Sequence, residues 1–507
     1  MSPIIFNANI IPVVTNEITI SSVSTDSKIA IKTDNPGVSA NDSFYLKLAN
    51  GSTNMTVYWG DGNSDVITAW NQPELTHQYA SVGTYQISID GDFHGFNFSN
   101  AYVPWSTDHD KVLSIDNWGN NVFGTMDGAF WGCSNMIGTY TDIPDTHLVT
   151  SFSDMFHDCF LFNSPVEFDT HAATDMTRMF WNALVFNQPV LFNTPNVTTM
   201  ESMFRRAEVF NQPINFDGNA LTNAMLMFNT CLAFNSPVNI GGTALTNCAG
   251  MFTGCGSFNS AVILDTTNVT NMGSMFSSAG AFNQPVLFDT SNVTDMHNMF
   301  NGAGAFNQPV PFDTSSVTRM DRMFASATIF NQSVSTFNTS NVTGVYMYGM
   351  FAGATAFNQP VPFDTAQVTS MLRMFDGATA FNQSVNFDTS LVTDMKEMFT
   401  GSALSILPTF NDTSNVTTME AMFYACASFD QDISGFDITS LTNANDMFTL
   451  SGWTITNYDL LLPAWNAYGT SNVHFSAGTA HYSAGAPTTA KAAMVSRGWV
   501  ISDGGTP

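Results

Sequence analysis

The chain has 507 residues and carries 13 Lys and Arg against 41 Asp and Glu, a formal net charge of −28. Only 11% of its residues are charged and 44% are hydrophobic, so the composition favours a large folded core over disorder. The negative charge argues against nucleic-acid binding and against docking on anionic lipid. No apolar run approaches the roughly 18–20 residues that cross a bilayer, so we predict no membrane insertion.

Residues 1–35 are β-prone, and we expect them to form an N-terminal docking segment. The chain begins MSPIIFNANIIPVV, in which an apolar stretch has no basic residue before it and no small-residue cleavage site after it. This pattern predicts no secretory signal peptide.

Residues 36–115 are expected to form a small β-sandwich. The segment VYWGDG is typical of a strand that enters an Asp-Gly turn, and GTYQISI alternates as a second strand does. Asp61, Asn63 and Asp65 have the spacing of the first three oxygen ligands in a Ca²⁺ loop, but Gln72 stands where the position-12 Glu would be. An ordinary hairpin turn is therefore the favoured interpretation, with Ca²⁺ as the alternative, and no other metal or cofactor is predicted.

Residues 116–451 are dominated by an internal repeat. A phenylalanine anchors each unit, preceded by methionine in nearly every case, and steps of 24 residues recur, with a single step of 27. The fourteen anchors are Phe130, Phe156, Phe180, Phe204, Phe228, Phe252, Phe276, Phe300, Phe324, Phe351, Phe375, Phe399, Phe423 and Phe448. Such regularity is the signature of stacked repeats.

Each unit combines two patterns. The apolar or small residues of Val293–Ala303 recur at intervals of three and four, which predicts a short helix with cap oxygens in Asp289–Asn292 before it. In Pro309–Phe312 the alternation predicts a very short strand. Neither element can bury a core alone, so we predict an α/β solenoid like that of leucine-rich repeats, with one strand and one helix in each 24-residue unit. At about 4.8 Å per coil, the array would span roughly 60 Å.

The repeat period predicts that equivalent residues of successive coils lie in columns along the axis. The anchor residues form the predicted core: Phe180, Phe204, Phe276, Phe300, Phe324 and Phe375. Seven residues after an anchor an asparagine recurs, which favours a structural ladder along the axis over a ligand site: Asn187, Asn211, Asn283, Asn307, Asn358 and Asn382. An Asp or Asn near the strand end also recurs, and turn capping is favoured there over a row of Ca²⁺ ligands.

Residues 452–507 break the period and are expected to form an α+β cap over the last coil. We predict helices over 458–465 and 488–497 and strands over 473–475 and 499–501, with Trp453, Trp465 and Trp499 as packing residues. Five of the six cysteines replace a small residue three positions after an anchor, so they are interpreted as buried free thiols.

The units FNQPVLFDTSNVTDMHNMF and FNQPVPFDTSSVTRMDRMF resemble the repeats of BspA-like leucine-rich-repeat surface proteins. The ending, which runs from NVHFSAG to RGWVISDGG, is similar to that of many members of this family. WGDG followed by HQY and GTYQISI resembles a polycystic-kidney-disease (PKD) type domain. The resemblance implies an extracellular adhesion protein, on a bacterial surface or on a virion, and does not imply an enzyme.

No nucleotide-binding, zinc-protease or serine-hydrolase motif is present, and no histidine recurs in the repeat. We therefore expect no catalytic residues and a non-enzymatic display and adhesion protein at a virion surface or in the extracellular space. Without a secretion signal, a phage fibre or decoration protein is favoured; a bacterial adhesin and a carbohydrate-active enzyme are the alternatives. The N-terminal region would bind virion or cell-surface structural proteins, the solenoid would bind a host glycan or surface protein, and self-association is left open.

Overall fold

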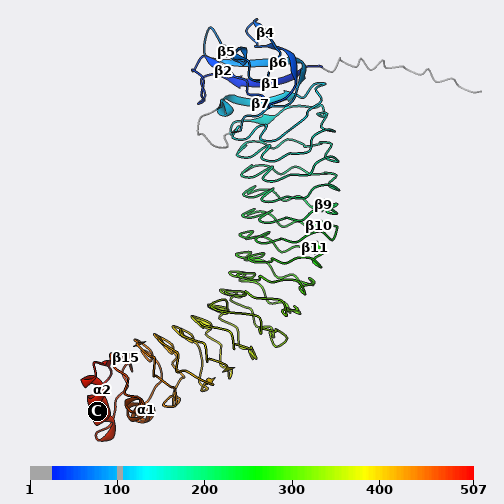
Figure 1. The fold of residues 1–507 in the computed structure, drawn as a ribbon. Helices are drawn as coiled ribbons and strands as arrows, with labels where there is room; N and C mark the ends of the chain where they lie inside the picture. Colours follow the sequence, from blue (N-terminus) through cyan, green and yellow to red (C-terminus); the bar gives the residue numbers. More distant parts are fainter. Residues whose placement is uncertain (1–24, 100–106) are drawn as a thin grey trace, which may run out of the picture.

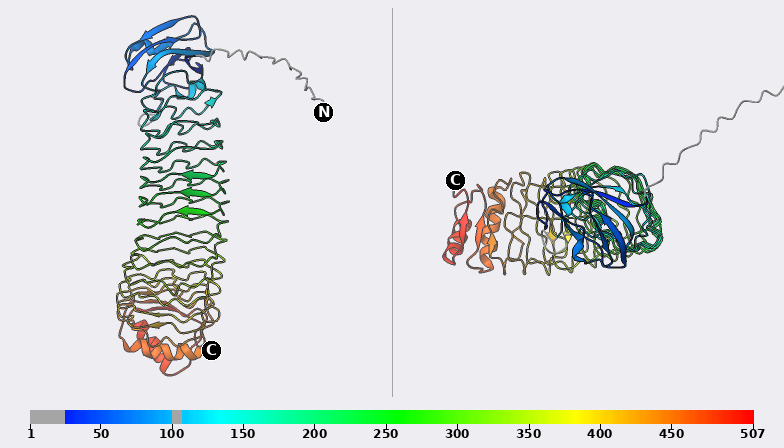
Figure 2. Two further views of the ribbon diagram at one scale, coloured as in Figure 1. Left: turned by 90° about the vertical axis from the view of Figure 1, so that its right-hand side faces the viewer. Right: turned by 90° about the horizontal axis from the view of Figure 1, so that it is seen from above.

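The computed structural model describes residues 25–99 and 107–507. A β-rich N-terminal domain lies against the first coil of a long solenoid, and two helices lie at its other end (Figure 1). The coils stack in one column, which is straight at first and curves toward its C-terminal end (Figures 1 and 2). The predicted solenoid with an N-terminal sheet region is confirmed. Among the described residues no helix is long and apolar enough to cross a membrane.

The N-terminal domain is built on one six-stranded sheet with the order β4-β3-β6-β1-β7-β8, and a separate pair joins β2 to β5. Short 3₁₀ turns at Pro73–Leu75 and His109–Lys111 precede β5 and β7. The strands are β1 (Ser27–Lys32), β2 (Ser43–Tyr45), β3 (Thr53–Tyr58), β4 (Ser64–Ile67), β5 (Thr76–Gln78), β6 (Thr84–Phe93), β7 (Val112–Asn117) and β8 (Ile137–Gly138).

Two expected boundaries fall inside this domain. Strand β1 pairs with β6 on one side and with β7 on the other, so the division after residue 35 separates a central strand from its own sheet. The rest of the expected docking segment, residues 1–24, lies outside the described residues. The division after residue 115 cuts β7, which pairs in parallel with β8 of the first coil. The sheet therefore continues directly into the solenoid.

Parallel, in-register strands join neighbouring coils where Val and Phe alternate. The longest run has β10 (Val238–Ile240) between β9 (Ile214–Phe216) and β11 (Val262–Leu264). A second run pairs β12 (Asn386–Phe387) with β13 (Thr409–Phe410). The short strand that we expected thus forms in some coils, and in others the same segment is extended without strand pairing.

The helix that we expected in each unit does not form: between residues 112 and 454, all of them described, the segment around each anchor is a run of turns. The reason is a left-handed residue two positions before and two positions after most anchors. Around Phe180 these are Arg178 and Asn182, with φ of 56° and 60°. A left-handed residue interrupts a right-handed helix, so the pair confines the chain to successive turns.

These turns direct alternate backbone N–H groups along the solenoid axis. The N–H groups of Arg178, Phe180 and Asn182 donate to carbonyl oxygens of the next coil at 2.8–2.9 Å. Between them, the N–H of Trp181 closes a turn on the carbonyl of Arg178 at 3.0 Å. Because half of these donors need the next coil as their partner, no coil is satisfied alone.

The core consists of continuous columns of stacked rings. Phe180 and Phe204 stack at 5.5 Å between centroids, and Phe180 also stacks at 4.1 Å on Phe186 of its own coil. Stacked and offset rings of this kind add packing energy to the burial of their area. All six predicted core positions are fully buried: Phe180, Phe204, Phe276, Phe300, Phe324 and Phe375. All six cysteines are free and buried, and burial raises the pKa of the Cys255 thiol to about 12.

The C-terminal cap extends the last coil. Strands β14 (Asn443–Ala444), β15 (His474–Ser476) and β16 (Val500–Ser502) form one parallel sheet, and helices α1 (Ile455–Ala467) and α2 (Ala486–Ser496) pack together. Trp453 stacks on the last anchor, Phe448, at 3.9 Å, while Trp465 and Trp499 are buried. The cap thus covers rings that would otherwise face water.

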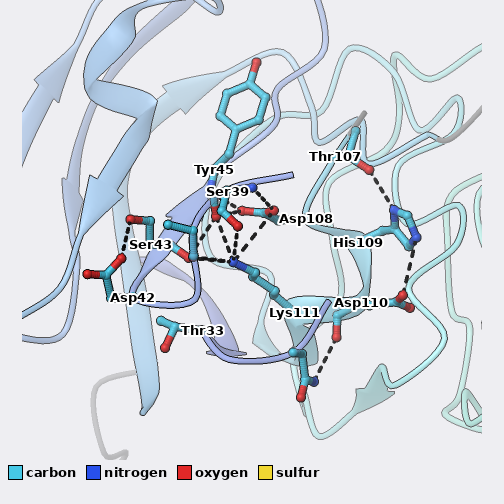
Figure 3. A network of polar contacts seen from close by, with 12 residues as sticks. Thr33, Ser39, Asp42, Ser43, Tyr45, Thr107, Asp108, His109, Asp110 and Lys111 are labelled. Atoms are coloured by element: carbon cyan, nitrogen blue, oxygen red, sulfur yellow. Dashed lines mark hydrogen bonds and ion pairs between the residues drawn. The ribbon is translucent and has the colours of Figure 1, made fainter. Parts of the chain in front are cut away.

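A buried ion pair ties the N-terminal domain together near the solenoid (Figure 3). Asp108 and Lys111 are both fully buried, with the Lys111 Nζ 3.9 Å from the Asp108 Oδ1. The Lys111 ammonium donates to the carbonyls of Ala40 and Ser43, and Asp108 accepts from the backbone N–H of Tyr45 at 2.7 Å. Burial lowers the pKa of Lys111 and Asp108 works against that shift. The pair fixes the 39–45 loop to the turn that precedes β7.

We expect Ser278→Gly to stabilise the solenoid by roughly 0.5 kcal/mol. Ser278 has a φ of 57°, and the removed left-handed strain of about 1–2 kcal/mol exceeds the added chain entropy of about 0.5–1 kcal/mol. Its neighbour Ser277 is outside the left-handed region, so Ser277→Gly should destabilise by roughly 0.5–1 kcal/mol. Urea unfolding of both variants measures the difference, and equal effects would contradict the role assigned to the left-handed position.

We expect Lys111→Met to destabilise the N-terminal domain by about 3–5 kcal/mol, because it leaves the Asp108 carboxylate buried without its counter-ion. The double variant Lys111→Met/Asp108→Asn keeps an acceptor for the Tyr45 N–H and removes the charge, so it should recover part of the loss. Denaturant unfolding followed by tryptophan fluorescence compares the two. A double variant no more stable than the single one would show that charge is not the cause.

Candidate interaction surface

The candidate calcium residues lie in the hairpin between β3 and β4. Asp61 accepts from the backbone N–H of Asn63 at 3.0 Å and from the His77 ring at 2.9 Å, while Asp65 accepts from the Trp59 indole at 2.8 Å. Burial works to raise the pKa of Asp61, but the bonds from His77 and Asn63 outweigh it and lower that pKa. The carboxylates thus close the hairpin turn, and among the described residues no group of three or more His, Cys, Asp or Glu is arranged to hold a metal.

The recurring asparagines form a continuous ladder along one edge of the coils. The side-chain oxygen of Asn283 accepts from the backbone N–H of Asn307 at 2.9 Å, and the Asn307 oxygen accepts from Asn331 in the same way. The amides therefore bond to the backbone of the next coil and not to one another. Each of the six asparagines that we predicted as ladder positions takes part in a bond of this kind: Asn187, Asn211, Asn283, Asn307, Asn358 and Asn382.

The recurring carboxylates near the strand end cap turns. The Asp313 carboxylate accepts from the backbone N–H of Ser315 at 2.9 Å, two residues on, and this bonding holds the pKa of Asp313 below its usual range. In several coils the next residue is a buried threonine whose hydroxyl donates to the following coil, as Thr194 does to the carbonyl of Asp217 at 2.7 Å. This edge is therefore a second polar ladder.

The segment of turns around the anchors carries every cation of residues 116–451, and we call its outer side the turn face. Arg178 reaches back one coil to form two bonds of 2.8 and 2.7 Å with Asp154, and Lys396 reaches forward to Glu420 at 2.8 Å. Burial works to raise the pKa of Asp154, but His157 and Arg178 hold it below its usual range. The cations are Arg178, Arg205, Arg206, Arg319, Arg322, Arg373 and Lys396.

A short polar and aromatic stack also lies on the turn face, over its first four coils. His157 is sandwiched between the indoles of Trp131 and Trp181 at 4.7 Å each, and the Arg205 guanidinium lies 4.7 Å from the Trp181 ring. These side chains occupy the position directly after the anchor, where most later coils carry Asn, Thr, Ser or Ala. The stack covers ring faces that would otherwise be wet.

Two of the cavities that open on the turn face are lined by both arginine and aspartate. One, of about 500 Å³, lies beside the N-terminal domain and is lined by Asp127, Trp131, Asp154, Asp175 and Arg178, among others. The other, of about 480 Å³, lies in the curved part of the solenoid and is lined by Arg322, Tyr348, Arg373 and Asp376, among others. We named no residue on this face from the sequence. Two features of the sequence mark this face: the arginines cluster near the anchors, and one step of the repeat is 27 residues long.

We expect Asn283→Ala to destabilise the solenoid by about 1–2 kcal/mol, because the backbone N–H of Asn307 loses its acceptor. Asn283→Asp keeps an oxygen in place and serves as the matched control, with a smaller loss. Denaturant unfolding of both variants gives the comparison. Equal losses would mean that the amide contributes by packing and not as an acceptor.

The repeat region matches a known family. The model described as "Mycoplasma protein of unknown function, DUF285" matches the overlapping segments 97–191, 167–262, 190–286, 242–311, 286–385, 310–406 and 386–475. Comparison with curated proteins gives no match, and comparison with solved structures gives none. The matched segments cover well over half of the chain and include the units that resemble BspA-like repeats. The chain therefore belongs to the DUF285 family of repeat proteins.

Proposed function

We propose that the protein is a non-enzymatic surface protein whose solenoid displays a binding face. The observation that carries the proposal is the contrast between the two sides of each turn. The anchor column is phenylalanine from coil to coil, whereas the position two residues after it, which is partly or fully exposed, is Asp158, Asn182, Arg206 or Thr230 in successive coils. A constant interior under a variable exterior is the arrangement that a scaffold for recognition requires.

The support for this role is mechanical and chemical. Hydrogen bonds along the axis join every coil to the next, so the solenoid can hold a binding surface at a distance from the N-terminal domain. The solenoid edges present exposed Asn, Gln, Ser and Thr, which hydrogen-bond to glycans and to protein surfaces. We propose the N-terminal domain, which has PKD-like sequence motifs, as the part that docks to a structural protein of the particle or cell.

The setting that we favour is a bacterial cell surface. The description of the matching family names a mycoplasma protein, which is a cellular source, and the repeats resemble those of BspA-like surface proteins. A phage virion is the other setting in which such units would serve the same role. Both settings place the chain outside the cytoplasm.

An antibody against the full chain should label intact cells of the source organism, and brief protease treatment of those cells should remove the signal. Beads coated with the full chain should bind host surfaces, and soluble chain should compete. Beads coated with acid-unfolded chain are the control. Co-sedimentation with phage particles would select the virion setting.

Recovery only from the soluble lysate would contradict the surface role. Release of new reducing ends from polysaccharide incubated with the pure chain would contradict the non-enzymatic role.

A further inference from the structure

One coil departs from the repeat, and the departure lies on the turn face. Between Val317 and Met320 of a regular unit there are two residues, whereas between the equivalent Val342 and Met347 there are four. These two extra residues, and one more in the preceding extended segment, lengthen the step between anchors from 24 to 27 residues. Because the interior stays in register, with Phe324 and Phe351 stacked at 5.7 Å, the two residues added in the turn segment must be accommodated on the outer side.

At the insertion, two tyrosine rings lie beside two arginines. Tyr346 is 42% exposed and the Arg319 guanidinium lies 5.4 Å from its ring centroid. Tyr348, half-buried, has the Arg322 guanidinium 4.8 Å from its ring. Arg322 forms no ion pair with any residue that the structure describes, whereas Arg319 is bonded to Asp321 at 2.7 Å. The Arg322 guanidinium is therefore free to bind an anion.

A groove runs on both sides of Tyr348. The cavity of about 480 Å³ is lined by Arg322, Arg373 and Asp376, together with Asn301 and Ser326. Three glycines in left-handed conformation also line it, so part of its wall is backbone: Gly349, Gly353 and Gly377. A neighbouring cavity of about 370 Å³ shares Tyr348 and Leu372 with the first and adds hydroxyls from Thr369, Ser370 and Thr393.

Among the described residues, the groove holds one unpaired positive charge, in a chain whose net charge is −28. Three of the thirteen basic residues lie around the insertion. Arg319 is paired with Asp321 and Arg373 with Glu397, which leaves Arg322 as the guanidinium available to an anion. At physiological ionic strength exposed charges more than about 8 Å apart are largely screened, so an anion bound at Arg322 would respond to the charges of the groove and little to the rest of the chain. Asp376, which also lines the groove, would repel a dense polyanion.

We propose that this groove, the Arg322–Tyr348 groove, binds a carboxylated sugar unit of a glycan. Arg322 would bind the carboxylate, for which its planar fork is suited. The tyrosine ring offers a flat apolar surface to the sugar ring, and Asp376, Asn301 and Ser326 would bond to its hydroxyls. The inference rests on the proposed binding function and specifies its ligand class.

The test uses the purified full chain and isothermal titration calorimetry with two matched pairs of probes. Trigalacturonic acid is compared with its methyl ester, and sialyllactose is compared with lactose. We expect the charged member of at least one pair to bind at least tenfold more tightly than its neutral partner, and the better pair identifies the source of the sugar. Arg322→Gln should weaken that binding at least tenfold, Tyr348→Ala should weaken it similarly, and Tyr348→Phe should retain it.

Arg206→Gln is the matched control, because Arg206 is also exposed and left-handed but lies outside the groove. Circular dichroism melting verifies that each variant is folded. Equal binding of charged and neutral probes, no binding of any probe, preference for tetraglutamate, or an unchanged affinity in a folded Arg322→Gln variant would each overturn the proposal. If beads coated with Arg322→Gln still bind host surfaces as the wild type does, the proposed function stands and the ligand class falls.

Discussion

The structure depends on the backbone N–H groups that each coil donates to its neighbour. In the turns around an anchor, alternate donors close turns within the coil and the others point along the axis. The asparagine and threonine ladders add side-chain bonds in the same direction. A single coil is therefore left with unsatisfied donors and uncovered rings, and stability belongs to the stack.

This dependence explains how the two ends are built. At the N-terminal end β7 supplies a parallel partner for β8 of the first coil, and at the C-terminal end β15 and β16 continue the sheet from β14. The buried pair of Asp108 and Lys111 then holds the loop that packs beside β7. Both ends are thus closed by elements that the repeat itself does not contain.

The same dependence separates structural positions from free ones. A side chain that points inward meets the equivalent residue of the next coil, so only apolar or small residues that pack against that neighbour are accepted there. A side chain that points outward meets water, and its identity can change from coil to coil. The insertion before Met347 follows this rule: it adds residues on the outer side and leaves the phenylalanine stack intact.

The helix expected from Val293–Ala303 illustrates where the sequence misleads. Apolar residues at intervals of three and four also arise when successive turns place every third or fourth residue inward, so the period alone does not distinguish the two conformations. What distinguishes them is the left-handed residue on each side of the anchor, and this position accepts Arg, Asn, Ser and Thr as well as Gly. Because the residue type at this position varies, the sequence alone does not reveal the left-handed conformation.

The sequence by itself determined the period, the phenylalanine core, the position of the asparagine column and the order of the three parts, because residues repeated at a fixed spacing must lie in register once the coils stack. The tertiary structure decided the handedness of the turns, the atoms that the asparagines bond, the union of β1 and β7 in one sheet, and the groove beside Tyr348. Each of these depends on contacts between coils or between distant strands, and such contacts are not encoded in any local pattern.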